Sequence, residues 1–125
     1  MTEGGKIKIF AVDDSIVTLK ILKKTLKDTD FEVIGEATSG KKALEQYDIL
    51  KPDLVLLDII MPELDGIETL ERLVSKDKNA KVVMVSSMGT KEKVMESLAK
   101  GAKNFVMKPY EKSTLIEVLK KVFKD

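Results

Sequence analysis

Hydrophobic residues form short continuous runs that alternate with longer, periodic segments. Five runs have the length and composition of strands, and they cover residues 7–12, 31–37, 54–57, 82–85 and 104–107. Uninterrupted apolar runs of this kind are typical of strands buried on both faces of a parallel sheet. The run at 54–57 ends abruptly at Asp58, and a carboxylate in such a place is unfavourable unless something requires it.

The segments between these runs carry apolar residues three or four positions apart, which predicts amphipathic helices. Ser15 is the expected N-cap of the first helix, and Thr114 with Glu117 fits a capping box for the last. Gly101 is expected just past the end of the fourth helix. The predicted inner positions are Ile16, Leu19, Leu22 and Leu26; Ala43, Leu44, Tyr47 and Leu50; Ile67, Leu70, Leu73 and Val74; Val94 and Leu98; and Leu115, Leu119, Val122 and Phe123.

Strict alternation of strands and helices with short connections predicts an α/β fold with right-handed crossovers. We expect a flavodoxin-like (βα)5 doubly wound open sheet, with five parallel strands in the order 2-1-3-4-5 and helices on both faces. A single domain should span residues 1–125, with residues 1–5 as a loose N-terminal tail.

Composition narrows the possible chemistry. The chain has neither cysteine nor histidine, which excludes disulfides, thiolate metal sites and histidine bases. Its net charge is +1, and Arg72 is the only arginine among 22 basic residues, so nucleic-acid binding is not expected. No apolar run reaches the length of a membrane span or a signal peptide. We therefore expect a cytoplasmic monomer that contacts neither nucleic acid nor membrane.

Polar residues follow four of the five predicted strands at the point where each one ends. The first strand is followed by Asp13 and Asp14, the third by Asp58, the fourth by Ser86 and the fifth by Lys108. The carboxyl ends of parallel strands meet at one edge of the sheet, where such folds bind ligands. Any one of these residues alone is more easily explained as a helix cap or a solvated side chain. Their coincidence at one edge predicts a site.

Three carboxylates and one lysine leave a formal charge of about −2, which a divalent cation would neutralise. Oxygen ligands suit Mg²⁺, and Mn²⁺ is also possible. We expect Asp13 and Asp58 as ligands, Asp14 directly or through water, and the backbone carbonyl of Ile60. A carboxylate beside Mg²⁺ and lysine can also be a nucleophile toward phosphorus. Asp58 is the expected phosphoacceptor, with Lys108 and Ser86 contacting the phosphoryl oxygens.

Rival enzymatic interpretations fit less well. Residues 35–42 resemble a P-loop, but Lys42 stands where that loop needs a serine or threonine for Mg²⁺. Phosphatases with an aspartyl nucleophile use an Asp-x-Asp spacing, whereas Asp13 and Asp14 are adjacent. A flavodoxin-type carrier needs a phosphate-binding loop after the first strand, and this acidic pair would repel phosphate.

As an ordered set, these residues resemble the receiver domain of two-component response regulators. The resemblance runs from about residue 6 to residue 123 and rests on the acidic pair, on Asp58, on the loop from Met61-Pro62 to Asp65-Gly66, on Ser86 and on Lys108-Pro109. It implies that Asp58 accepts a phosphoryl group from a phosphohistidine of a sensor histidine kinase. The chain would then be a signalling switch and not an enzyme in the ordinary sense, since it catalyses only its own phosphorylation and slow dephosphorylation. A degenerate receiver is disfavoured because every one of these positions is filled.

The resemblance also implies a switch. Phosphorylation in the family draws the residue at Ser86 inward and turns an aromatic residue on the fifth strand, here Phe105. Tyrosine is common at that position, so an output that needs its hydroxyl is in doubt. The Lys108-Pro109 bond is expected to be cis. The output surface would lie on the fourth helix, fifth strand and fifth helix, where lysines 91, 93, 103 and 112 would suit an acidic partner.

Within the family, the stretches 12–15 and 86–89 look most like chemotaxis regulators of the CheY type. This implies a stand-alone receiver whose output partner is the flagellar motor switch and which a separate phosphatase can reset. A receiver of another phosphorelay, natural or cut from a longer chain, remains the alternative, and a small aspartyl-phosphate phosphatase is a more remote one. Ile60 and Met88 occupy positions that tune dephosphorylation in the family, and their apolar side chains predict a longer-lived phosphoryl group.

Overall fold

The computed structural model describes residues 5–124, so most of the predicted tail at residues 1–5 lies outside the described residues. The strands and helices alternate along the whole of this range. Their bounds are β1 (Ile7–Val12), α1 (Ile16–Leu26), β2 (Phe31–Ala37), α2 (Gly40–Leu50), β3 (Leu54–Leu57), α3 (Gly66–Lys76), β4 (Val82–Ser86), α4 (Lys91–Ala99), β5 (Asn104–Met107) and α5 (Lys112–Lys124). No helix among the described residues is long and apolar enough to cross a membrane.

The five strands form one parallel sheet in the order β2-β1-β3-β4-β5, as the sequence predicted. β3 lies at its centre and pairs with β1 through Leu54 to Leu57 and with β4 through Val55 to Leu57. All four of its residues are buried, which explains why the run contains no polar position. The order switches between β1 and β3, so their carboxyl ends border the expected site.

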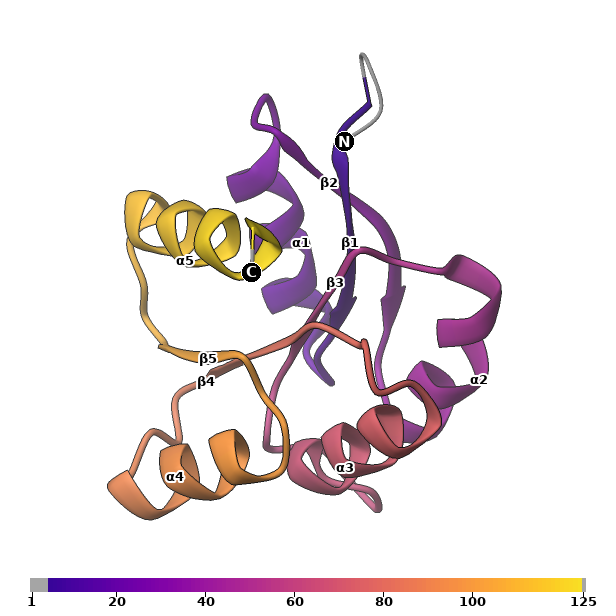
Figure 1. Cartoon of the computed structure of the whole chain (residues 1–125). Helices are drawn as coiled ribbons and strands as arrows, with labels where there is room; N and C mark the ends of the chain where they lie inside the picture. Colours follow the sequence, from indigo (N-terminus) through magenta and orange to yellow (C-terminus); the bar gives the residue numbers. More distant parts are fainter. Residues whose placement is uncertain (1–4, 125) are drawn as a thin grey trace.

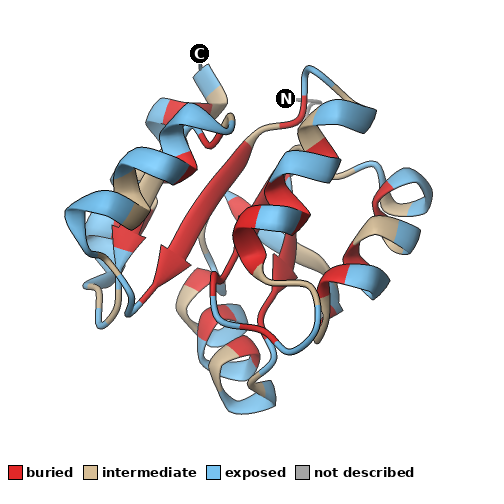
Figure 2. Ribbon diagram, turned by 90° about the horizontal axis from the view of Figure 1, so that it is seen from below, coloured by how far each residue is buried: buried red, intermediate tan, exposed pale blue. Residues whose placement is uncertain are grey.

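Helices cover both faces of the sheet (Figure 1), with α1 and α5 on one face and α2, α3 and α4 on the other. Successive strand residues point to opposite faces, so neighbours along β3 belong to different clusters. Leu54 and Leu56 pack with α1 and α5, whereas Val55 and Leu57 pack with α2 and α3. Buried residues accordingly follow the strands and the inward faces of the helices (Figure 2).

The predicted inner face of α4 is wrong. Leu98 is 45% exposed and Val94 is only half-buried, while Ser97 is the one buried residue of this helix. Ser97 fits because it is small and because its hydroxyl donates a hydrogen bond to the Lys93 carbonyl at 2.8 Å. Ile16, also expected inside, is 61% exposed at the start of α1. The remaining predicted inner positions are buried or half-buried.

Helix ends follow local chemistry at most positions. The Ser15 hydroxyl accepts a hydrogen bond from the Thr18 amide at 3.2 Å, as an N-cap should. Gly101 follows the C-cap of α4 with a φ of 115°, a backbone conformation that favours glycine. The predicted capping box at Thr114 is wrong, because α5 already begins at Lys112 and the Glu111 carbonyl accepts its first hydrogen bond.

Candidate functional site

The site forms where four neighbouring strands, β1, β3, β4 and β5, end. The backbone ladder continues one residue beyond β1 and β3, because the Asp13 amide donates to the Ala37 carbonyl and the Asp58 amide to the Val12 carbonyl, both at 3.0 Å. The Lys108 amide likewise donates to the Ser86 carbonyl at 3.0 Å. These side chains therefore start from rigid sheet edges and not from mobile loops.

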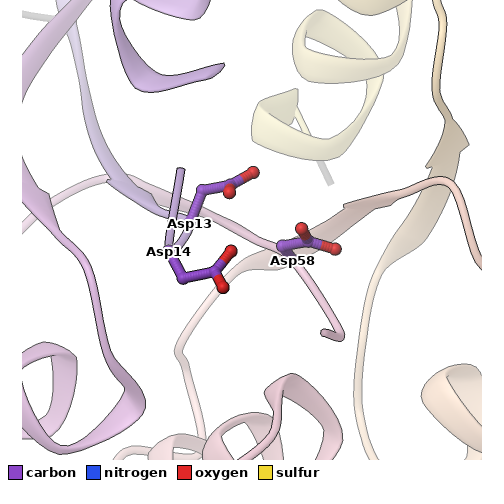
Figure 3. A group of neighbouring side chains, drawn as sticks. All are labelled: Asp13, Asp14 and Asp58. Atoms are coloured by element: carbon purple, nitrogen blue, oxygen red, sulfur yellow. The ribbon is translucent and has the colours of Figure 1, made fainter. Parts of the chain in front are cut away.

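Three carboxylates converge there. Asp13, Asp14 and Asp58 each offer an oxygen, and these oxygens all lie within 4.8 Å of one another (Figure 3). Asp13 and Asp58 are 6% and 8% exposed, whereas Asp14 lies open to solvent. Two buried acids this close to a third repel one another strongly unless cations neutralise them.

Among residues 5–124, Lys108 is the cation that forms ion pairs with this cluster. Its Nζ lies 2.6 Å from Asp13 Oδ2 and 3.2 Å from Asp58 Oδ2, so one ammonium group bridges two acids from different strands. Burial by itself would lower the pKa of Lys108, but the hydrogen bond to Asp13 and the charges of Asp58 and Asp13 together raise it. The lysine therefore stays charged at neutral pH.

Asp13 is held from two directions. Its Oδ1 accepts a hydrogen bond from the Ser15 amide at 2.9 Å, and its Oδ2 pairs with Lys108. Burial raises the pKa of Asp13 above its usual value, and the nearby charge of Asp58 adds to this, although Lys108 and the Ser15 amide partly offset both. Proton uptake by Asp13 is thus easier than in water, chiefly because the carboxyl group is buried and only secondarily because Asp58 is nearby.

The other predicted residues surround this cluster. Ser86 is fully buried at the end of β4, and its hydroxyl accepts a hydrogen bond from the Met88 amide at 3.2 Å. Phe105 is half-buried on β5 opposite Met84 and packs against the core beneath α2 and α3. The Ile60 side chain is 49% exposed. The Lys108–Pro109 bond is cis, as the resemblance implied.

Gly66 was interpreted from sequence only as part of a turn, and the structure gives it a further role. A Cβ at this position would lie 1.9 Å from the backbone oxygen of Asp58, so only glycine lets α3 approach the strand end this closely. The Gly66 amide donates to the Ile59 carbonyl at 2.7 Å, and the Asp58 Oδ1 accepts from the Ile59 amide at the same distance. Because this constraint acts at the backbone of a distant residue, sequence spacing alone could not reveal it.

The donor set suits a hard divalent cation. Three carboxylates whose oxygens lie within 4.8 Å of one another carry more negative charge than Lys108 can balance. Oxygen ligands of this kind match Mg²⁺, which keeps several waters and takes one or two carboxylates. Asp13, Asp14 and Asp58 fit such an ion.

Comparison with known proteins gives consistent matches. The family model for the response regulator receiver domain matches residues 9–120. The chemotaxis protein CheY of Listeria monocytogenes is 44% identical over 118 residues, covering 94% of this chain and 99% of that protein. CheY of Thermotoga maritima is 41% identical over 117 residues, covering 94% and 98%. A chain in the crystal structure of the CheX-CheY-BeF3-Mg²⁺ complex from Borrelia burgdorferi superposes with a TM-score of 0.92 at 36% identity, covering 96% of this chain and 91% of that one.

Proposed function

The chain belongs to the response regulator receiver domain family, and we propose that it is a phosphorylation-activated switch with Asp58 as its phosphoacceptor. The observation that carries this is the position of Lys108, whose ammonium group lies between the buried carboxylates of Asp13 and Asp58. A lysine in this position can neutralise a phosphoryl group transferred to Asp58. The proposal extends to a single domain over residues 1–125 that works in the cytoplasm as a monomer.

The proposed metal is Mg²⁺, held by Asp13, Asp14 and Asp58, with the Ile60 carbonyl as a further ligand. When bound, Mg²⁺ would neutralise charge on the phosphoryl oxygens. The support is the carboxylate cluster and the Mg²⁺ complex of the Borrelia relative, which gives no support to Mn²⁺. Asp13 and Asp14 would orient the ion, and the sheet edge would fix them against Asp58.

The proposed reaction transfers a phosphoryl group from a phosphohistidine of a sensor histidine kinase. A carboxylate oxygen of Asp58 forms the new bond to phosphorus, and the bond between phosphorus and the imidazole nitrogen breaks. Lys108 donates hydrogen bonds to the phosphoryl oxygens, and its pairing with Asp13 keeps it charged and in place. The Ser86 hydroxyl, which accepts a hydrogen bond from the Met88 amide, gives up that bond and donates one to a phosphoryl oxygen. This change pulls the segment between β4 and α4 toward the site.

Incubation with Mg²⁺ and acetyl phosphate, followed by intact-mass measurement, tests this reaction. We expect one phosphoryl adduct that is lost on adding base. It should be absent from Asp58→Asn, and it should form much more slowly in Lys108→Gln. Absence of any adduct in the native chain would exclude the proposal, and continuous release of phosphate over many turnovers would favour a phosphatase.

Similarity to CheY proteins supports a role in chemotaxis, with the flagellar motor switch as output partner. The proposed output surface consists of α4, β5 and α5. It carries the expected lysines and also exposed Met95, Leu98 and Met107, so a partner helix with both acidic and apolar residues would fit it. A receiver for another two-component pathway is the second candidate, because Phe105 lacks the hydroxyl that is common at this position.

The rim of the site bears on how long the phosphoryl group lasts. Ile60 and Met88 are 49% and 38% exposed and place apolar side chains where polar groups in the family help to orient water. We expect the phosphoryl group of Ile60→Asn to hydrolyse several-fold faster than that of the native chain, measured as the decay of the adduct after acetyl phosphate is removed. Unchanged decay would contradict this part of the proposal.

A further inference from the structure

A groove lined by lysines lies at the end of the sheet opposite to the aspartate cluster. α1 begins beside the cluster and runs back along the sheet, so its last turn and the start of β2 lie at the end marked N in Figure 1. The groove between them has a volume of about 580 Å³. The basic groove, as we call it, is surrounded by Lys6, Lys20, Lys23, Lys24 and Lys27.

Positive charge is concentrated at this groove. Only Asp28 and Glu32 supply negative charge among its lining residues, against the five lysines. The whole chain carries a net charge of +1, so this small surface is far more basic than the average of the molecule. A surface of this kind raises the local concentration of anionic partners and speeds their association.

The charge pattern of α1 is unlike that of the other helices. Among the five helices in residues 5–124, α1 alone contains no acidic residue. Lys20 lies three and four positions before Lys23 and Lys24, so like charges face one another along the helix, and its C-cap is a further lysine, Lys27. The dipole of the helix favours lysine in its last turn, but it gives no reason for Lys20 or for Lys6, which lies just before β1.

These lysines keep their charge available. Within residues 5–124 none of the five forms an ion pair, whereas Lys76 pairs with Asp48 and Lys100 with Glu71, both at 2.8 Å. All five lysines are exposed. An anionic partner could therefore bind them without first breaking existing ion pairs.

The groove also has an apolar floor, formed by Leu26, Phe31 and the half-buried Val33. A partner segment with carboxylates, and with an apolar side chain to cover the half-buried Val33, would match this groove. Leu26 and Phe31 are each 1% exposed and only support its floor from below. Nucleic acid matches less well, because the groove contains no arginine for bidentate phosphate contacts and Phe31 is only 1% exposed, which leaves it unable to stack on a base. A concave groove also matches a peptide segment better than it matches a flat membrane surface.

We propose that the basic groove is a docking site for an acidic segment of a partner protein. Its distance from Asp58, at the other end of the sheet, makes this docking independent of phosphorylation. Such a site would hold the chain on its partner in both states of the switch, while the output surface responds to phosphorylation alone.

The test uses a fluorescein-labelled peptide of glutamate and leucine and measures its fluorescence anisotropy with the full chain at low ionic strength. We expect Lys24→Gln/Lys27→Gln to weaken binding about tenfold, since each lost ion pair reduces the affinity. The matched control is Lys121→Gln/Lys124→Gln, which removes the same charge from exposed positions in the last turn of α5 and should bind as the native chain does. A peptide with glutamine in place of glutamate should not bind.

Phosphorylation provides a second readout. Affinity should be the same with and without acetyl phosphate and Mg²⁺, and the same in Asp58→Asn, so this result does not depend on the proposed function. Equal weakening in the two double variants would show a general charge effect and overturn the proposal. Binding of a short DNA duplex or of phosphatidylglycerol vesicles through the groove, without binding of the peptide, would overturn it as well.

Discussion

α3 and α4 lie beside each other on the same face of the sheet, yet they are attached to it very differently (Figure 1). α3 buries Gly66, Ile67, Thr69, Leu70 and Leu73, whereas α4 buries only Ser97 and leaves Met95 and Leu98 60% and 45% exposed. Burying a leucine or isoleucine side chain contributes about 1.5–3 kcal/mol. The free energy that holds α3 against the sheet is therefore several times larger than that holding α4.

The two helices also follow different parts of the site. α3 begins against the backbone of Asp58, and α4 follows Ser86 at the end of β4. The better-attached helix thus lies against the proposed phosphoacceptor, Asp58, while the weakly attached one follows Ser86, the residue proposed to move. Regions with few buried apolar contacts open and shift at lower free energy than the rest of a fold. This division suits the proposed switch, in which the phosphorylation site would stay rigid and the output surface would adjust.

The most direct test of this difference in attachment is to truncate one leucine in each helix. Leu70 is fully buried, so Leu70→Ala should lower the free energy of unfolding by ~2–5 kcal/mol. Leu98→Ala should change it by no more than ~0.5 kcal/mol, because the side chain is already exposed. Urea unfolding followed by circular dichroism measures both, and equal losses would contradict the contrast.

Glycine substitutions at the starts of the two helices give the second test. A Cβ at Gly66 meets the Asp58 backbone, so Gly66→Ala should cost ~2–3 kcal/mol of stability and slow phosphorylation by acetyl phosphate at least tenfold. Gly89→Ala is the control, since the three atoms nearest to its Cβ all belong to the Met107 side chain, which is flexible and half exposed. That variant should keep near-native stability. A Gly66→Ala chain that is phosphorylated at the native rate would refute the proposed role of this contact.

The other end of α3 offers a test through pH. The Tyr47 hydroxyl donates a hydrogen bond to Asp77, the C-cap of α3, at 2.8 Å. Burial first, and then this bond to a carboxylate, raise the pKa of Tyr47 above its usual value. The stabilisation is therefore present below about pH 10, the unfolded value, and is lost as pH rises above it. Tyr47→Phe should cost ~1 kcal/mol at neutral pH and should lack this alkaline loss when urea unfolding is repeated across pH.

The smallest effect concerns an ion pair between α3 and Lys100, the C-cap of α4. Lys100 Nζ lies 2.8 Å from Glu71 Oε2, and both side chains are largely exposed. The hydrogen bond to Glu71 raises the pKa of Lys100, yet solvent and salt screen an exposed pair of this kind. Lys100→Gln should leave the urea midpoint unchanged within error at physiological salt. A clear loss of stability would mean that α4 is held more firmly than its burial implies.

Much of this contrast could not be predicted from the sequence. The strands could be predicted because each is a continuous apolar run, and their order could be predicted because short connections alternate strands with helices. Both features are visible in the local sequence pattern. The spacing of Val94 and Leu98 indicated an inner face for α4. In the structure, however, this nine-residue helix packs against the sheet with one small buried residue, Ser97. Periodicity reports which residues could be buried and not how closely a helix approaches the sheet.

The candidate site shows the same limit. Topology and residue type were enough to predict that Asp13, Asp58 and Lys108 meet, and the structure brings them within hydrogen-bonding distance. The contact between Gly66 and the Asp58 backbone, and the Ser15 amide that holds Asp13, depend on backbone positions that no residue pattern records. Such contacts are visible only once the chain has been placed in three dimensions.

The pairing of Lys108 with Asp13 joins residues 95 positions apart in the sequence. No fragment of the chain that lacks β1 or β5 can form it, even if the fragment keeps Asp58 and folds locally. If Asp58 reacts with acetyl phosphate as proposed, this reactivity requires both β1 and β5 and would report on assembly of the sheet. Two complementary halves, divided between α3 and β4 and inert when separate, should regain phosphorylation only on recombining into the native sheet.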